Sequence, residues 1–282
     1  MKTLFKFYLL SIIILSVSCV SMKQNELKMI ELKEPKRPAG QKSVLQLSAD
    51  PIPTVRIGFI GVGNRGGAAL RRYIHMEGVE IKAICDLKEE RVKTGQSYLQ
   101  NKNLPPATEY VGEDSWKEVC ERDDIDLIYI CTDWLSHTPI AVYAMKKGKH
   151  VAMEVPAAVT IEECWQLVDT AEKTRKHCMM LENCCYDFFE LTTLNMAQKG
   201  VFGDIVHGEG AYIHDLRSQL KNVEGWRVKF YETYTGNPYP THGFGPICHT
   251  MNIHRGDKMD FLVSVSSNQF GISAYLKELY GD

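Results

Sequence analysis

The sequence lacks an excess of charge of one sign and, after residue 20, lacks any long apolar run. Its 282 residues include 33 lysines and arginines against 35 aspartates and glutamates, so the formal net charge is −2. No basic stripe runs along the chain, which argues against nucleic-acid binding. No later segment approaches the ~18 consecutive apolar residues of a membrane-spanning helix. The chain is 44% hydrophobic, which suits one large or two modest globular domains.

The nine cysteines also lack the C-x-x-C spacing of zinc and redox sites. Several of them end apolar runs or lie in helical patterns, namely Cys85, Cys131, Cys120 and Cys164. We therefore expect buried small hydrophobic side chains rather than disulfides. His249 and His254 are expected to be structural, because nothing near them in the sequence completes a metal site. We expect no metal centre.

The first 19 residues differ from the rest of the chain. A basic start with Lys2 and Lys6 precedes the apolar residues 7–17, and small residues follow before Cys19. This is the layout of a secretory signal, and Cys19 resembles a bacterial lipoprotein processing site. Lipid attachment at Cys19 and a plain cleaved signal both stay open. Either predicts an exported protein, periplasmic or held at a bacterial membrane only through a lipid anchor. The polar residues 20–52 are expected to form a linker.

The chain is organised around a glycine-rich loop that follows an apolar run at residues 57–60. Gly61, Gly63 and Gly66 have the spacing G-x-G-x-x-G, and an Ala- and Leu-rich helical pattern comes next. Gly61 permits a tight turn, Gly63 lets a pyrophosphate approach, and Gly66 lets helix and strand pack closely. The start of that helix directs unpaired N–H groups at the phosphates. The loop predicts dinucleotide binding.

Asp86 indicates which of the two nicotinamide cofactors, NAD or NADP, is bound. It ends a second apolar run, residues 79–85, about 20 residues after Gly66, as the acidic residue of dinucleotide-binding folds does. Its carboxylate is placed to accept hydrogen bonds from an adenosine ribose, and its charge would repel a 2′-phosphate. Alone, Asp86 would pass for an ordinary turn residue. With the loop, it predicts NAD rather than NADP.

Strand and helix patterns alternate from residue 55 to residue 183. Helical patterns cover 68–75, 88–100, 115–121, 139–147 and 160–176, and apolar strands are expected at 126–132, 150–153 and 179–183. Thr160 and Glu163 have the spacing of a capping box. The alternation predicts an α/β fold, a doubly wound parallel sheet forming an NAD-binding Rossmann domain over residues 53–183. Ligands then bind beyond the carboxyl ends of the strands.

The pattern changes after Asn183. One helix is expected at residues 188–199, and extended segments are expected at 204–216, 226–234 and 261–270. Their alternation predicts a mainly antiparallel sheet in a second α+β domain, residues 184–282, which we expect to bind the substrate.

These motifs together resemble a known family. The glycine loop, Asp86, His137 after a strand and the Glu154-x-Pro156 segment resemble the Gfo/Idh/MocA oxidoreductases. Most of that family has a proton-transferring lysine between the Glu and the Pro, where this chain has Val155, and this departure argues against ordinary sugar dehydrogenation. Segments 181–186, 208–217, 226–227 and 239–243 narrow the resemblance to glycoside hydrolase family 109, the NAD-dependent α-N-acetylgalactosaminidases.

That resemblance implies a reaction that uses and restores NAD within one turnover. Hydride leaves C3 of the sugar, the resulting ketone acidifies the C2 proton, a base removes it, and the glycosidic bond breaks by elimination. Water then adds and the hydride returns. A proton beside a carbonyl is acidic enough for a modest base, so the paired carboxylates of ordinary glycosidases are not needed. The implied substrate is a glycan with a terminal α-N-acetylgalactosamine.

The resemblance also implies roles for single residues. Besides the glycines Gly61, Gly63 and Gly66, the NAD contacts are Asn64, Arg65, Asp86, Trp134, Leu135, Ser136, His137, Glu154, Val155, Asn183 and Tyr239. The sugar contacts are Tyr212, Arg227, Tyr239, Pro240, Thr241 and His242. Tyr212 and His242 are the candidates for proton transfer. Pro240 and Gly243 predict that His242 lies on a loop. Singly, each of these residues could equally be core or surface.

Family members are longer, so we expect a shortened second domain and NAD binding more robust than catalysis. Two other functions stay open: an exported sugar dehydrogenase that releases reduced cofactor, and an NAD-binding remnant without turnover. The relatives suggest a homodimer.

Overall fold

The computed structural model describes residues 29–222, 224–234, 236–237, 240–267 and 270–281. By its backbone contacts the chain divides into two units, Met1–Pro38 and Ala39–Asp282. In the first unit, residues 29–38 form neither helix nor strand. The predicted leader and Cys19 lie outside the described residues, so export and lipid attachment stay predictions.

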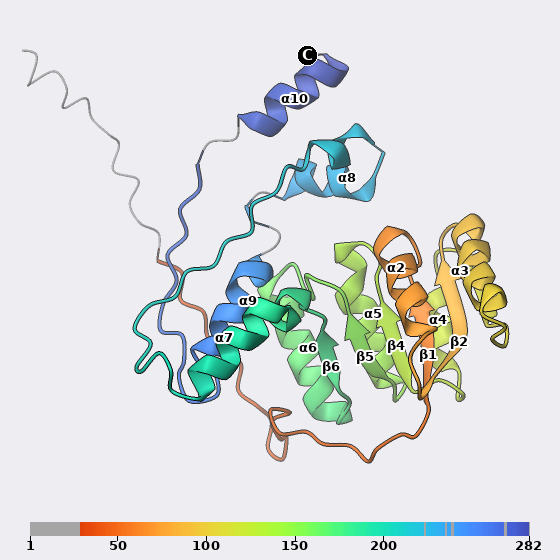
Figure 1. Ribbon diagram of the computed structural model, residues 1–282, viewed down its shortest axis with the longest axis horizontal. Helices are drawn as coiled ribbons and strands as arrows, with labels where there is room; N and C mark the ends of the chain where they lie inside the picture. The colour runs from red at the N-terminus through yellow and green to blue at the C-terminus, as the bar shows by residue number, and fades with distance from the viewer. Residues whose placement is uncertain (1–28, 223, 235, 238–239, 268–269, 282) are drawn as a thin grey trace, which may run out of the picture. The chain divides into compact units, whose positions relative to one another are not determined.

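Six parallel strands form one sheet in the second unit (Figure 1). They are β1 (Val55–Ile60), β2 (Val79–Asp86), β3 (Thr108–Val111), β4 (Leu127–Ile130), β5 (His150–Met153) and β6 (Cys178–Met180). Their order is β3-β2-β1-β4-β5-β6, the dinucleotide-binding order, in which winding reverses between β1 and β4. The predicted Rossmann sheet is confirmed. Strand β3 was not among the strands predicted from the sequence, because its residues, Thr-Glu-Tyr-Val, are partly exposed and form no apolar run.

Helices cover both faces of this sheet. Helices α2 (Asn64–Tyr73) and α3 (Glu89–Asn101) pack on one face, and α4 (Ser115–Glu121), α5 (Trp134–Lys146) and α6 (Ile161–Thr174) pack on the other. Successive strand side chains point to opposite faces, so Phe59 of β1 joins one apolar cluster with Leu70 of α2, and its neighbour Ile60 joins the other with Ala144 of α5. Because helices cover both faces of the sheet, successive residues of its central strands are mostly buried, and the apolar runs in the sequence are continuous.

Two contacts fix α6. The Thr160 hydroxyl accepts the Glu163 N–H at 3.1 Å, and the Glu163 carboxylate accepts the Thr160 N–H at 3.2 Å, so the predicted capping box is confirmed. Gln41 donates to the Glu172 carboxylate at 2.7 Å. Residues 39–52, part of the predicted linker, thus contact α6, although they form no helix or strand.

After β6 the described chain is helical or irregular. Its elements are η1 (Asn183–Tyr186), α7 (Phe188–Gln198), η2 (Arg217–Lys221), α8 (Trp226–Thr233), α9 (Pro240–Thr250) and α10 (Gly271–Tyr280). Within the described residues beyond Met180, strand pairing is limited to one isolated bridge between Ile253 and Asp257. The predicted antiparallel sheet is not found there: residues 204–216 and 261–267 are irregular.

The strand predicted at 226–234 is wrong, because the segment forms helix α8. Apolar residues at 226, 228, 230 and 234 fit a period of two, which suggested a strand. Trp226, Phe230 and Tyr234 are also four residues apart, and this spacing places them on one helical face. The rings of Phe230 and Tyr234 stack at 4.5 Å, and Trp134 contacts both Trp226 and Phe230. Aromatic packing therefore favours a helix over a strand for this segment.

The eight described cysteines are free thiols. Cys85, Cys120 and Cys185 are buried, and burial raises the pKa of Cys120 to about 12, so these thiols act as apolar side chains. Cys164 is exposed on α6, so the expectation of burial is wrong for it. Among the described helices, none combines the length and the apolar character needed to cross a bilayer.

Candidate active site

Two glycines of the G-x-G-x-x-G segment that joins β1 to α2 have no room for a side chain. Gly61 has φ +85°, and a Cβ there would lie 2.4 Å from the Cys131 carbonyl oxygen. A Cβ at Gly66 would lie 1.9 Å from the carbonyl oxygen of Gly61. Helix α2 begins directly after Gly63, so its first N–H groups and the positive end of its dipole face the loop. The loop has the form that a diphosphate requires.

Asp86 holds this loop against the end of β2. Its buried carboxylate accepts the Val62 N–H at 2.9 Å and the Lys88 N–H at 3.0 Å. Arg91 lies 3.4 Å from the same carboxylate and beside Gly63, a position that the sequence did not single out. Asp86 therefore lies beside the glycine loop, where the adenosine ribose is expected.

Glu154 gathers three elements into one hydrogen-bond network. The Tyr129 hydroxyl donates to Oε1 of Glu154 at 2.6 Å, and Arg65 Nε donates to its Oε2 at 3.0 Å. Arg65 also donates to the Asn183 side chain at 3.1 Å. Burial, and then the charge of Glu154, raises the pKa of Tyr129, which stays a proton donor. The structure thus brings together three predicted cofactor residues.

Tyr129 was not singled out in the sequence, where it lies inside the apolar run of β4. A phenol in a fully buried strand needs a hydrogen-bond partner, and this was the only signal available.

The predicted residues 134–137 form the first turn of α5, at the point where winding reverses. The Asp133 side chain caps this turn, accepting the N–H groups of Leu135 and Ser136 at 3.1 and 3.2 Å. His137 is buried and its Nδ1 lies 2.8 Å from the Pro156 carbonyl oxygen. Because a carbonyl only accepts, Nδ1 carries the proton, and burial lowers the His137 pKa and keeps the ring neutral.

His137 Nε2 is buried and has no hydrogen-bond partner within the described part of the chain. An unpaired buried acceptor is costly, and here it lies in the turn that follows β4, next to the switch point. The glycine positions 61, 63 and 66, which carry no side chain beside the start of α2, are the feature that fits a bound dinucleotide.

Cation–π contacts join a predicted sugar residue, Arg227, to a predicted cofactor residue, Trp134. The Arg227 guanidinium lies 4.8 Å from the ring centres of both Trp134 and Trp226. Trp134, from α5, and Val155 also form an apolar cluster with Tyr212. Val155 is buried at the place where the oxidoreductase resemblance would put a lysine.

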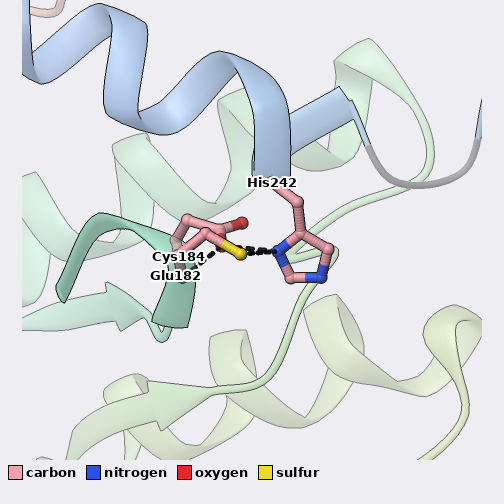
Figure 2. Close-up of side chains that lie close together, drawn as sticks. All are labelled: Glu182, Cys184 and His242. Atoms are coloured by element: carbon pink, nitrogen blue, oxygen red, sulfur yellow. Dashed lines mark hydrogen bonds and ion pairs between the residues drawn. The ribbon is translucent and has the colours of Figure 1, made fainter. Parts of the chain in front are cut away.

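His242 pairs with a carboxylate that the sequence did not single out (Figure 2). Its Nδ1 lies 2.5 Å from Glu182 Oε1 and 3.5 Å from Cys184 Sγ. The side chains of His242 and Glu182 are 9% and 6% exposed, so water screens this polar contact only weakly. Glu154 lies directly after β5 and Glu182 lies two residues after β6, and this position at the carboxyl edge of the sheet could have indicated Glu182.

The prediction that His242 lies on a loop is wrong, because the residue lies in the first turn of α9. Pro240 starts this helix, and a proline at the first helical position costs no hydrogen bond. Gly243 faces Gly210 so closely that a Cβ on either would clash with the other's backbone. This contact places the Tyr212 ring 4.6 Å from the His242 ring.

The other predicted sugar residues flank this pair. Pro240 is exposed and Thr241 is half-buried at the start of α9, whereas Tyr239 lies outside the described residues. His249 packs near Tyr186, at 6.5 Å between ring centres. The described residues therefore form two clusters, one around Glu154 and one around His242, which meet at the neighbours Asn183 and Glu182.

Comparisons with known proteins agree with this division. A model of the Gfo/Idh/MocA oxidoreductase family, an NAD-binding Rossmann fold, matches residues 55–182. A model of the glycosyl hydrolase 109 C-terminal domain matches residues 186–282. Among solved structures, myo-inositol 2-dehydrogenase from Lactobacillus plantarum matches with a TM-score of 0.59 at 19% identity, covering 71% of this chain and 57% of that one. At this identity the likeness shows the fold alone.

Curated relatives are closer in sequence. The chain is 59% identical over 248 residues to an alpha-N-acetylgalactosaminidase of Bacteroides fragilis, covering 86% of this chain and 58% of the relative. It is 51% identical over 255 residues to a glycosyl hydrolase family 109 protein of Porphyromonas gingivalis, covering 90% of this chain and 54% of the relative. The chain thus spans little more than half the length of these relatives.

Proposed function

Because the chain belongs to glycoside hydrolase family 109, we propose that it binds NAD and hydrolyses terminal α-N-acetylgalactosaminides. The observation that carries the proposal is the meeting of two clusters at consecutive residues. Asn183 is bonded to Arg65 in the Glu154 network, and Glu182 is bonded to His242. Redox chemistry at one sugar carbon and proton transfer at its neighbour need this adjacency. The name of the B. fragilis relative supports the choice of sugar.

The cofactor, when bound, supplies a hydride acceptor that is restored before product leaves. The chain's own residues would hold it: the loop at residues 61–66 would receive the diphosphate, and Asp86 would receive the ribose. His242 Nδ1 lies 2.5 Å from Oε1 of the buried Glu182 carboxylate, and this contact orients the ring to serve as the base. Tyr212, whose ring centre lies 4.6 Å from that of His242, is the second group able to hold or donate a proton.

One assay separates this proposal from the two other functions. Purified full-length protein is incubated with an aryl α-N-acetylgalactosaminide without added NAD, while aryl release and absorbance of reduced nicotinamide are followed together. Aryl release without lasting reduction supports the proposal. Lasting reduction would instead identify a sugar dehydrogenase, although the buried Val155 supplies no amine for that reaction. Silence in both signals identifies an NAD-binding protein without turnover, and overturns the proposal.

Replacing His242 tests its role directly. His242→Ala should lower aryl release by roughly 10²–10⁴-fold, the usual loss when a general base is removed, and should leave the bound NAD content unchanged. His249→Ala, on the same helix, is the matched control and should retain both. A proportional loss of NAD in His242→Ala would contradict the role, because it would make His242 a cofactor contact.

A further inference from the structure

Three side chains with different donor atoms converge beside Tyr212: the Glu182 carboxylate, the Cys184 thiol and the His242 imidazole (Figure 2). Their ligand atoms all lie within 4.8 Å of one another, a spacing that no other His, Cys, Asp and Glu group in the described part of the chain has. We propose that these three residues form a binding site for a zinc ion.

The distances suit a four-coordinate ion after a small adjustment. Zinc bonds of about 2.0–2.3 Å at tetrahedral angles separate the ligand atoms by about 3.3–3.6 Å. The Cys184 Sγ to His242 Nδ1 distance is 3.5 Å already. The 2.5 Å contact between Nδ1 and Glu182 Oε1 is a hydrogen bond, and the carboxylate must withdraw by about 0.8 Å to admit the ion. The three protein ligands leave the fourth position to water or a small ligand.

Charge and burial favour an ion at this point. A carboxylate and a thiolate together balance a divalent charge, and the neutral imidazole completes a mixed O, S and N set that zinc accepts. Glu182 is 5% exposed, and its Oε2 is buried without a hydrogen-bond partner among the described residues. Oε1 accepts the Cys184 N–H at 3.0 Å, so the carboxylate that receives the ion is already oriented by the backbone. Cys184 is only partly buried, which opens a path from solvent.

Zinc binding changes which nitrogen of His242 carries a proton. The Cys184 thiol proton leaves to solvent, and Nδ1 must give up its proton because its lone pair now binds the metal. The ring stays neutral by taking a proton at Nε2, the nitrogen that points away from Glu182 and Cys184 in Figure 2. A protonated Nε2 cannot act as a base. Zinc is therefore an inhibitor of the proposed hydrolase, a consequence that rests on the proposed function, whereas the site itself does not.

Cobalt(II) titration of the full-length reduced protein tests the site without any activity assay. A thiolate bound to Co²⁺ gives a near-ultraviolet charge-transfer band, and four-coordinate Co²⁺ absorbs strongly in the visible. We expect one equivalent of Co²⁺ to produce both signals at micromolar protein, and one equivalent of Zn²⁺ to abolish them. Cys184→Ser should remove the charge-transfer band, and His242→Ala should weaken Co²⁺ binding at least 10-fold.

Two controls keep this test decisive. Cys164→Ser removes an exposed thiol elsewhere and should leave the spectrum unchanged, and far-ultraviolet circular dichroism checks the fold of each variant. A charge-transfer band that persists in Cys184→Ser, or a wild-type protein without such a band at equimolar Co²⁺, would overturn the site. Silence in the glycosidase assay would overturn the proposed hydrolase and leave the cobalt result standing.

Discussion

Residues 53–183 and residues 184–282 contribute to the site in different ways. The first region buries its strands and helices in two apolar clusters, which include fully buried side chains such as Leu70 and Met145. In the described part of the second region, the buried apolar side chains are Cys185, Leu220 and Val228. Several large ones there are exposed, with Phe188 at 78% and Phe261 at 83%. Burial of apolar side chains therefore stabilises the fold of the first region far more than that of the second.

The second region is instead placed by a few specific contacts. His242 pairs with Glu182, Gly243 faces Gly210, and Arg227 lies against Trp134. Each of these contacts joins a predicted functional residue, or its neighbour, to another segment of the chain. The first region holds a cofactor site by packing, and the second adds reactive side chains through polar and aromatic contacts.

The largest expected effect is the loss of a buried leucine from the first region. Leu70→Ala removes a fully buried side chain on α2 and should lower the free energy of unfolding by about 2–5 kcal/mol. Leu262→Ala, in the second region, removes a side chain that is 87% exposed and should change it by less than about 0.5 kcal/mol. Urea unfolding followed by circular dichroism measures both. Equal losses would show that Leu262 is covered in solution and would break the comparison.

A smaller effect is expected at the glycines. Gly66→Ala places a Cβ 1.9 Å from a backbone oxygen that cannot move freely, so it should lower the free energy of unfolding by about 1–3 kcal/mol and also abolish NAD binding. Gly271→Ala, at the start of α10, meets nothing within 4 Å. It should be neutral or stabilise the helix by a few tenths of a kcal/mol, about what alanine gains over glycine at a helix end. Unfolding curves and NAD titration check the pair, and NAD binding retained in Gly66→Ala would contradict the role given to the loop in binding the diphosphate.

The same difference explains what could be predicted from the sequence. In the first region, the period of the apolar residues and the burial of both sheet faces agree, so the sheet, the glycine loop and the Thr160–Glu163 capping box were all predicted correctly. In the second region, one apolar spacing fitted a strand and a helix equally well at residues 226–234. Only contact with Trp134, about 90 residues earlier in the chain, decides between them.

The site divides along similar lines. The glycines of the loop and Asp86 were predicted from spacing, because the chemistry of dinucleotide binding fixes that spacing. Glu182 and Cys184 belong to a motif segment but were not assigned a role, because their partner His242 is 60 residues away from Glu182 and on another element. No local pattern reports such a pairing. The position of Glu182 after β6 was the only available signal.

The smallest expected effect concerns two aspartate–arginine pairs, one in each region. Asp126 accepts hydrogen bonds from Arg56 Nε at 2.9 Å and Nη2 at 2.7 Å across 70 residues, and Arg56 lowers the pKa of Asp126. Asp215 pairs with Arg217 only two residues on, and this lowers the pKa of Asp215 to about 2. Arg217 and Asp215 are 67% and 60% exposed, so solvent screens the pair.

Only the pair of the first region should couple folding to pH. A folded-state pKa below the unfolded value means that ionised Asp126 stabilises the folded state above about pH 4, and that this stabilisation is lost as the pH falls through the folded pKa. The stability difference between wild type and Asp126→Asn should therefore be constant near neutral pH and shrink below about pH 4. Asp215→Asn should show almost no pH-dependent difference, because a pair two residues apart can also form in the unfolded chain. Urea midpoints between pH 3 and pH 7 measure both, and a pH-dependent difference for Asp215→Asn that matched that of Asp126→Asn would show that the second region's pair is also linked to folding.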